Sequence, residues 1–524
     1  MPDAMNKAST PVIRRPGEQG ASVVLLTFLL TFLLIPVVGL GIDGSVIFWV
    51  KARLSAAVDS AALATAKNFD ATAGQSYFTA NFPTGFLGAS LAPGYPAVTL
   101  TETSTNVWQG TVQASVIVPL YFMRILHYQT ATVGDTGQAT RRDANIMMVL
   151  DRSNSMNTAP EPPNNQTACQ AMVSAAQQFL TVFVPGHDEV GLITFQTGAN
   201  LDFSPTTSFN QPTGSNLSET LSTLACAGDT SSAQGLSMAY QGVGSPAAGG
   251  IQQMRAARPN ALNVILFFTD GEPNGVNATY PIKTLADQSD QRYESTNTST
   301  LTSYGASGCN STDVLSGIFA DGSAETATSN ANLNPTGFTV AVLSAAGVSI
   351  TSTANPTVIS GASGCAFNNS NWQYSAYGRQ DVAYIPTTDN YGNSTLGSEF
   401  GTLDLFPAYP SAQCASAAAC PYGGQIRPDM PRTARYVSFN AADSIAHKIR
   451  NDTTDNGTLI YTIGLQGNET MAINQNFMER LANDTRADDY DSTKPTGMFF
   501  LATDLSGLQD AFLQVASQIL HLTQ

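Results

Sequence analysis

Charged residues are scarce in this chain, and it contains no long cluster of Lys and Arg. Asp, Glu, Lys and Arg make up 12% of the 524 residues, about half the usual share. The formal net charge is −16, whereas a nucleic-acid-binding protein needs basic patches that meet phosphate. We therefore expect no nucleic-acid partner. An acidic surface suits divalent cations, although acidity often serves solubility alone.

Signatures of common hydrolases and nucleotide-binding enzymes are also missing. The chain has no GxSxG, and no Gly-Lys pair precedes Ser or Thr as it does in a P-loop. Zinc proteases carry HExxH, but no such motif is formed by the four histidines, His127, His187, His447 and His521. These absences favour a binding protein over an enzyme, with a metal-dependent hydrolase as the less favoured alternative.

Closely spaced cysteine pairs, which zinc sites usually show, are absent as well. The six cysteines, none of them in a CxxC pair, are Cys169, Cys226, Cys309, Cys365, Cys414 and Cys420. Three disulfides formed in an oxidising compartment are the favoured interpretation. Six unpaired core thiols are the alternative.

A long apolar run near the N-terminus predicts a membrane-spanning helix. Residues 21–42 contain no charged residue, and about 20 apolar residues at 1.5 Å each cross a hydrocarbon core of ~30 Å. The run is longer than the apolar part of a signal peptide, and a buried core helix is the alternative. The Ala- and Leu-rich residues that follow predict that the helix continues to about Lys67, with a kink at Pro36.

The orientation of this helix is not decided by the basic residues, which flank it on both sides. The cysteines and the Asn-, Ser- and Thr-rich body favour an outside location for the C-terminal part. We therefore expect a cytoplasmic segment at 1–20 and a membrane helix with its continuation at 21–69. The remainder would lie in the periplasm or outside the cell.

The rest of the chain divides by its hydrophobic pattern. Residues 70–142 show the alternation of apolar and polar residues typical of strands, and we interpret them as a β-rich stalk. From residue 143 to 524, buried strands alternate with helices, which predicts an α/β domain with a parallel sheet covered on both sides. The expected strands are NIMMVL, EVGLITF, NVILFFTDG and LIYTIGL, and the expected helices are Ala168–Phe183, SSAQGLSMAYQ, AADSIAHKIR and LSGLQDAFLQVASQIL.

The alternation is lost between about residues 275 and 435. This segment is rich in Ser, Thr, Asn, Gly and Tyr and holds four of the six cysteines. A connection of this length is an inserted subdomain or a partly disordered region. FTVAVLSAAGVSITS is the part of it that we expect to supply strands.

Oxygen-bearing side chains follow the ends of the expected strands. The first buried strand ends in Asp151, with Ser153 and Ser155 next; Asp270 follows another; Thr230 precedes a helix. In an open α/β sheet, ligands bind outside the carboxyl ends of the strands. Each of these residues could merely cap a helix or form a turn. Together, two carboxylates and three hydroxyls are hard ligands that suit Mg²⁺, Mn²⁺ or Ca²⁺.

These motifs resemble the metal-ion-dependent adhesion site, or MIDAS, of von Willebrand factor A (VWA) domains. The family pattern is DxSxS, then Thr, then Asp, carried here by DRSNSM, DTSSAQGL and FFTDGEPN. The resemblance covers about 143–274 and 436–522 and implies a Rossmann-like α/β fold. It implies the metal ligands Asp151, Ser153, Ser155, Thr230 and Asp270, although CAGDT replaces the usual glycine-rich approach to the Thr. It also implies a protein partner that offers an acidic side chain to the ion.

The N-terminal region is similar to TadG-like proteins of bacterial Tad/Flp pilus systems. AAVDSAALATA after the apolar run is a fairly specific match, followed by YFTANFP and PLYFMRIL. Such proteins join one membrane helix, a β-region and often a VWA domain. The resemblance implies a single-pass membrane protein that binds Tad pilus or pseudopilin components. A cut after Gly20 would place Leu25 where pseudopilins carry Glu, so we expect the helix to remain as an anchor. A structural assembly scaffold with a vestigial metal site is the alternative.

Two further expectations follow from positions in the chain. Cys169 lies near the start of the helix after DxSxS and Cys226 just before Thr230, so we expect the two to pair. Cys309–Cys365 and Cys414–Cys420 follow only from proximity, since six cysteines allow 15 pairings. The insertion leaves the sheet just after Asp270, so we expect 275–435 to form a cap beside the metal and to help select the partner.

Overall fold

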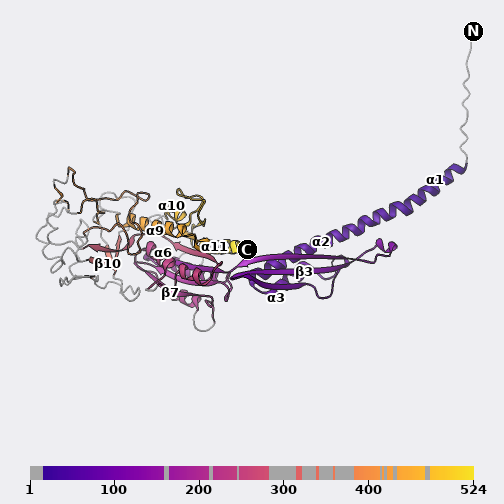
Figure 1. Ribbon diagram of the computed structural model, residues 1–524, viewed down its shortest axis with the longest axis horizontal. Helices are drawn as coiled ribbons and strands as arrows, with labels where there is room; N and C mark the ends of the chain where they lie inside the picture. Colours follow the sequence, from indigo (N-terminus) through magenta and orange to yellow (C-terminus); the bar gives the residue numbers. More distant parts are fainter. Residues whose placement is uncertain are drawn as a thin grey trace, which may run out of the picture. The chain divides into compact units, whose positions relative to one another are not determined.

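The chain divides into two compact units, Met1–Thr103 with Trp108–Arg141 and Ser104–Val107 with Arg142–Gln524. Figure 1 shows the computed structural model. The structure describes residues 16–157, 165–211, 216–244, 247–281, 314–321, 338–341, 358–359, 383–412, 416–417, 420, 422–428, 433–466 and 473–523.

The first unit begins with one long helical rod (Figure 1). It consists of α1 (Pro16–Leu29), the π-helical turn η1 (Leu30–Leu34) and α2 (Ile35–Asn68). Pro36 is the second residue of α2, just after η1. Proline lacks an N–H and its ring clashes with a carbonyl one turn earlier, and a π turn absorbs such a disruption. Among the described residues, Val23–Asn68 is the one helix that is long and apolar enough to cross a membrane, and an 18-residue stretch of it has a mean hydropathy of 2.8.

The C-terminal half of α2 packs against a small antiparallel sheet. Its strands are β1 (Ser90–Leu91), β2 (Ala97–Ser104), β3 (Val107–Pro119) and β4 (Thr130–Arg142), in the order β1-β3-β2 with β4 also pairing β3. Val50, Leu54 and Val58 of α2 form a common core with Val112 and Val116 of β3. The strands predicted for residues 70–142 are therefore present in the structure.

Helix α3 (Ala71–Asn81) lies within the region that the sequence pattern indicated as β-rich. Asp70 caps it, because its carboxylate accepts hydrogen bonds from the N–H groups of Thr72 at 2.8 Å and Ala73 at 3.3 Å. Asp is a favoured N-cap residue, and this local signal was available in the sequence. The short 3₁₀ turns η2 (Phe86–Gly88) and η3 (Met123–Leu126) complete the unit.

The second unit is built on a six-stranded sheet, in the order β14-β13-β8-β5-β6-β7. Every described neighbouring pair is parallel except β6 with β7. All residues of the two central strands, β5 and β8, are buried, as in strands covered on both faces. The predicted parallel-rich α/β sheet is confirmed. Its strands are β5 (Ala144–Asp151), β6 (Glu189–Phe195), β7 (Ala199–Thr206), β8 (Leu262–Thr269), β13 (Leu459–Leu465) and β14 (Phe499–Ala502).

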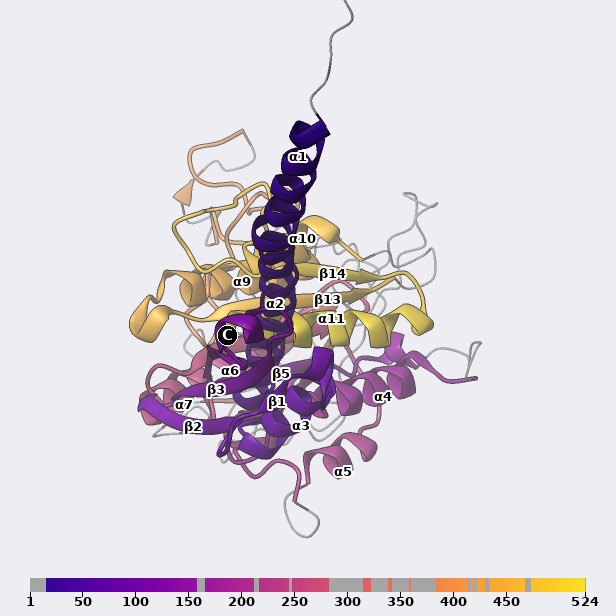
Figure 2. The same ribbon diagram turned by 90° about the vertical axis from the view of Figure 1, so that its right-hand side faces the viewer.

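Helices cover both faces of this sheet, and alternate residues of each strand serve the two cores. Met147 and Val149 face one core, and Ile146 and Met148 face the other. The first core includes α6 (Ser232–Gln241), α7 (Ile251–Ala257), α9 (Thr433–Asn451) and α10 (Gln475–Ala482). The second includes α4 (Ala168–Leu180), α5 (Leu217–Ser222) and α11 (Leu505–Thr523), and Figure 2 shows α4 and α11 together.

The described parts of the insertion add to the first core. Strand β9 (Gly275–Pro281) pairs with β10 (Val314–Asp321), which also pairs with β11 (Phe338–Ala341) and β12 (Val358–Ile359). Ile385 and Ile426 are fully buried among residues of α6 and α9. Helix α9 begins at Thr433, eight residues before the predicted AADSIAHKIR, because Val437 and Phe439 have apolar partners in this core.

The C-terminal end of α6 is held by a partly buried ion pair and a hydrogen bond. Asp452 accepts hydrogen bonds from the Tyr240 hydroxyl and the Arg255 guanidinium, and so joins α6 and α7 to the residues after α9. Burial would raise the pKa of Asp452, but these two hydrogen bonds lower it below its ordinary value.

We expect Asp452→Asn to lower stability at pH 7 by about 1–3 kcal/mol, the usual worth of a hydrogen bond to a charged group. A carboxylate with a lowered folded-state pKa stabilises the fold fully above its unfolded pKa of about 4, and this contribution is lost progressively as the pH falls from there through the lower folded-state pKa. The wild-type advantage should therefore shrink between about pH 5 and pH 2. Urea unfolding of both proteins across this range measures it, and a constant difference would contradict the role of Asp452.

Candidate metal centre

Two buried carboxylates lie at the same edge of the sheet. Strands β5 and β8 are parallel neighbours, with Leu150 opposite Phe268, so Asp151 at the end of β5 and Asp270 just after β8 emerge together. Asp151 is 0% exposed and Asp270 is 4% exposed. The strand register thus places Asp151 and Asp270 at one rim of the sheet, as expected from the sequence.

Hydrogen bonds connect these carboxylates to both predicted serines. Asp151 Oδ1 accepts a hydrogen bond from the N–H of Ser153 at 2.7 Å, and its Oδ2 accepts one from the Thr269 hydroxyl. Ser155 Oγ donates to Asp270 Oδ1 at 2.6 Å and lies 2.8 Å from Ser153 Oγ. Four of the five predicted ligands therefore form one continuous polar cluster.

Thr230, the fifth predicted ligand, is held beside this cluster through its backbone. Its N–H donates to Asn274 Oδ1 at 2.7 Å, and its carbonyl accepts from the N–H of Asn274 at 2.9 Å. Two residues earlier, the carbonyl of Gly228 accepts from the N–H of Asn154 at 2.8 Å. The Thr230 hydroxyl has no hydrogen-bond partner among the described residues, and the side chain is 5% exposed.

Asn274, like Thr269, is a residue of this rim that was not predicted from the sequence. It binds both backbone groups of Thr230 from the segment that follows Asp270, so it fixes the loop of one predicted ligand to the strand end of another. The only signal was an amide side chain a few residues beyond TDG, and Asn in such a turn usually bonds its own neighbours.

The two carboxylates have no positive counter-charge within the described chain. Neither Asp151 nor Asp270 forms an ion pair with a described residue. Burial raises the pKa of Asp151, and burial together with the charge of Asp151 raises the pKa of Asp270 above its ordinary value. Two buried like charges are unfavourable unless a cation or a proton lies between them. The donor set, all oxygen, fits a hard divalent cation.

A disulfide braces two of the loops at this rim. Cys169, in the first turn of α4, is bonded to Cys226, four residues before Thr230, with Cα atoms 6.1 Å apart. This predicted pairing is confirmed. Cys420 is also disulfide-bonded, while Cys309, Cys365 and Cys414 lie outside the described residues, so the other two pairings stay predictions.

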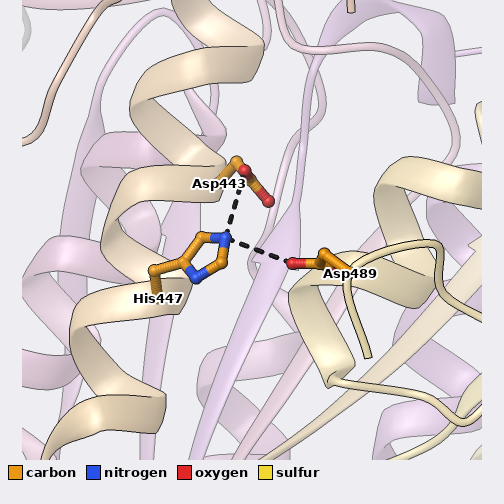
Figure 3. Close-up of side chains that lie close together, drawn as sticks. All are labelled: Asp443, His447 and Asp489. Atoms are coloured by element: carbon orange, nitrogen blue, oxygen red, sulfur yellow. Dashed lines mark ion pairs between the residues drawn. The ribbon is translucent and has the colours of Figure 1, made fainter. Parts of the chain in front are cut away.

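A second cluster of possible metal ligands lies elsewhere in this unit and was not foreseen. Figure 3 shows His447 of α9 between Asp443, one turn earlier, and Asp489; its Nε2 lies 3.5 Å and 3.1 Å from their Oδ2 atoms. Both carboxylates already have buried cationic partners, because Arg480 binds Asp443 at 2.7 Å and Arg450 binds Asp489 at 3.0 Å. Their charge is thus balanced by protein, unlike that of the rim pair.

Comparison with known families confirms both resemblances. Residues 146–272 match the von Willebrand factor type A domain, and residues 20–68 match the family described as Flp pilus-assembly TadE/G-like. The chain thus joins a TadE/G-like N-terminal segment to a VWA domain. No curated protein matches the chain.

Several solved structures match this chain at low identity and low TM-score. One is the vWF domain of the type V pili tip protein Mfa5 from Porphyromonas gingivalis, with 16% identity, a TM-score of 0.34, and coverage of 74% of this chain and 98% of that one. The pilus adhesin SpaC from Lactobacillus rhamnosus GG shows 11% identity and a TM-score of 0.34 over 83% of this chain and 36% of that one. Proximal thread matrix protein 1 from the mussel byssus, with a zinc-occupied MIDAS motif, shows 21% identity and a TM-score of 0.20 over 26% and 30%.

We expect loss of the Cys169–Cys226 bond to destabilise the VWA domain. The bond spans 57 residues, and closing a loop of that length in the unfolded chain corresponds to about 4 kcal/mol in the chain-entropy model. The double variant Cys169→Ala and Cys226→Ala should therefore unfold at a clearly lower denaturant concentration than the wild type. Equal unfolding midpoints would show that the bond does not brace the domain.

Proposed function

We propose that this protein is a membrane-anchored, non-enzymatic adhesion or assembly protein of a Tad/Flp-type pilus system that binds a protein partner through a divalent cation. The observation that carries the proposal is the pair of buried carboxylates, Asp151 and Asp270, at the ends of two adjacent parallel strands. Neither forms an ion pair with any residue that the structure describes. The cation would be Mg²⁺, with Mn²⁺ or Ca²⁺ as alternatives.

Asp151, Ser153, Ser155, Thr230 and Asp270 would hold the ion. Asp151 is oriented by Thr269 and by the N–H of Ser153, so it would act as a fixed anchor. The serine hydroxyls hydrogen-bond each other and Asp270, and they would turn their lone pairs to the ion. When bound, an ion with so few carboxylate ligands supplies an open position for an acidic side chain of the partner.

The expected location of the protein in the cell supports the same proposal. The apolar helix and the TadE/G-like match fit a membrane-anchored pilus protein. The disulfides favour an oxidising compartment for the VWA domain, so we place it in the periplasm or outside the cell, with residues 21–42 crossing the bilayer once. The partner would be a Tad pilus or pseudopilin component.

Calorimetric titration of the full chain in detergent with Mg²⁺ or Mn²⁺ tests the metal site. We expect one ion per chain and no detectable binding after Asp151→Ala, because half of the carboxylate charge is removed. Asp452→Asn is the matched control, since it removes a half-buried carboxylate charge that contacts Tyr240 near the C-terminal end of α6 and should leave the affinity unchanged. Equal affinity in wild type and Asp151→Ala would reject the assignment.

The insertion would help to select the partner. Its described part begins at the rim, where the N–H groups of Asn274 and Gly275 bind the carbonyl of Thr230, and Arg435 at its other end contacts Glu272 at 3.4 Å. Both ends of the segment therefore lie near Asp270.

Replacing residues 282–382 with a short Gly/Ser linker tests this role and leaves the packed residues after 383 in place. We expect the variant to keep its Mg²⁺ affinity, because all five predicted ligands remain. It should lose most of its binding to isolated Flp pili in the presence of Mg²⁺. A variant that keeps both activities would show that the insertion is not a recognition element.

A further inference from the structure

The turn between β3 and β4 carries large apolar side chains that are exposed and that no described residue covers. Tyr121 is 57% exposed, Ile125 is 70% exposed and Tyr128 is 61% exposed. Single exposed apolar residues are ordinary on protein surfaces, but three within eight residues of one turn form a patch. We call residues 120–129 the apolar turn.

Asp43 fixes the apolar turn to the membrane helix. Its carboxylate accepts hydrogen bonds from the N–H groups of Tyr121 at 2.9 Å, Phe122 at 3.0 Å and Met123 at 2.8 Å. Asp43 is only 2% exposed and is the first charged residue after the apolar run 21–42. Three hydrogen bonds to one carboxylate form a strong attachment, so the level of the turn along the helix is well defined.

Gly39 brings the turn closer still. A Cβ atom at this position would lie 2.6 Å from both Cβ and Cγ of Phe122, which is too short for any side chain. Phe122 therefore packs directly on the backbone of α2, one turn before Asp43 and inside the apolar run. The apolar turn lies beside residues 39–43, where the predicted hydrocarbon span ends.

Along α2, the side chains change from apolar to aromatic to charged close to the apolar turn. Phe48 and Trp49 are 67% and 61% exposed, and they lie about 8–9 Å beyond Asp43 at 1.5 Å per residue. Farther along, Lys51 forms an ion pair with Asp135 at 2.9 Å. Apolar residues, then aromatic residues, then charged pairs follow one another along the axis, as they do across a membrane interface, where Trp and Tyr are enriched.

We propose that the apolar turn inserts into the interfacial layer of the phospholipid bilayer that α2 crosses, as a second membrane contact of the first unit. The proposal rests on the membrane anchoring in the proposed function. Lipid is the occupant because the turn is attached to the helix at the end of its apolar span. The polar layer on each side of the hydrocarbon core is about 5–8 Å thick, enough to receive Tyr121, Ile125 and Tyr128. The contact would keep the unit from rotating freely about its single helix.

Fluorescence quenching in vesicles tests this contact. The full chain, carrying an environment-sensitive fluorescent amino acid at one position, is reconstituted into phosphatidylcholine–phosphatidylglycerol vesicles. Position 125 probes the turn and position 33 the predicted span. Position 77 is the matched reference, because Tyr77 is 53% exposed on α3. That helix packs near Thr65, about 30 Å along α2 from the end of the span.

We expect a doxyl group near the lipid headgroup to quench the probe at 125 and aqueous iodide to quench the probe at 77. A probe at 33 should be quenched by a doxyl group deep in the acyl chain. Quenching of 125 by iodide alone, with 33 in lipid, would overturn the proposal and leave the anchoring intact. Protection of 125 from both quenchers would indicate a protein covering and would also overturn it. Iodide quenching at 33 would reject the anchoring and this proposal together.

A substitution in the attachment gives a second test. Asp43→Ala should make position 125 accessible to iodide and leave position 33 unchanged, because the turn is released while the helix still spans the bilayer. Asp59→Ala is the matched control, since Asp59 is an exposed carboxylate on the same helix. Unchanged quenching at 125 in both variants would show that Asp43 does not position the turn at the membrane.

Discussion

The repulsion between two buried carboxylates is the constraint on which the arrangement of the second unit depends. The parallel pairing of β5 with β8 brings Asp151 and Asp270 to one rim, and burial removes the water that would screen them. The surrounding loops then supply serine hydroxyls, and no described basic side chain forms an ion pair with either carboxylate. The Cys169–Cys226 bond and the Asn274–Thr230 hydrogen bonds hold these loops in place. A fold that keeps two like charges together in this way is suited to bind a cation.

The cluster of Asp443, His447 and Asp489 differs from the rim in how the charge of its carboxylates is balanced. It contains similar ligand types within one small volume, but Arg480 and Arg450 neutralise its carboxylates. A buried ion pair with good geometry serves to join elements, here α9 with the segment after α10. The presence or absence of a buried arginine therefore separates a structural network from a metal centre more clearly than the ligand types do.

Much of the second unit was predictable because its signals are local. Buried strands such as NIMMVL appear as continuous apolar runs, and the ends of parallel strands share one rim, so Asp151, Ser153, Ser155 and Asp270 could be grouped from sequence. The pairing of Cys169 with Cys226 followed from the same geometry. The antiparallel edge strand β7 was missed, since ANLDFSPT contains Pro and little apolar pattern. The true start of α9 was also missed, since its first turns are stabilised by partners distant in sequence.

Other features depend on contacts that no local pattern encodes. Nothing near Asn274 indicates that it would hold the backbone of Thr230, 44 residues earlier. In the sequence, Asp43 is simply the first charged residue after an apolar run. Its hydrogen bonds to the β3–β4 turn, 78–80 residues away, could not be predicted from that position. In both cases one side chain joins two segments through backbone N–H groups, which every residue type except proline offers.

The central claim is that the rim holds one divalent cation. Crystals of the protein grown with Mn²⁺ test it most directly, through the anomalous difference map collected near the manganese absorption edge. The account predicts a single strong peak between the side chains of Asp151, Ser153, Ser155, Thr230 and Asp270. A map with no peak at this rim, or with its main peak between Asp443, His447 and Asp489, would contradict it.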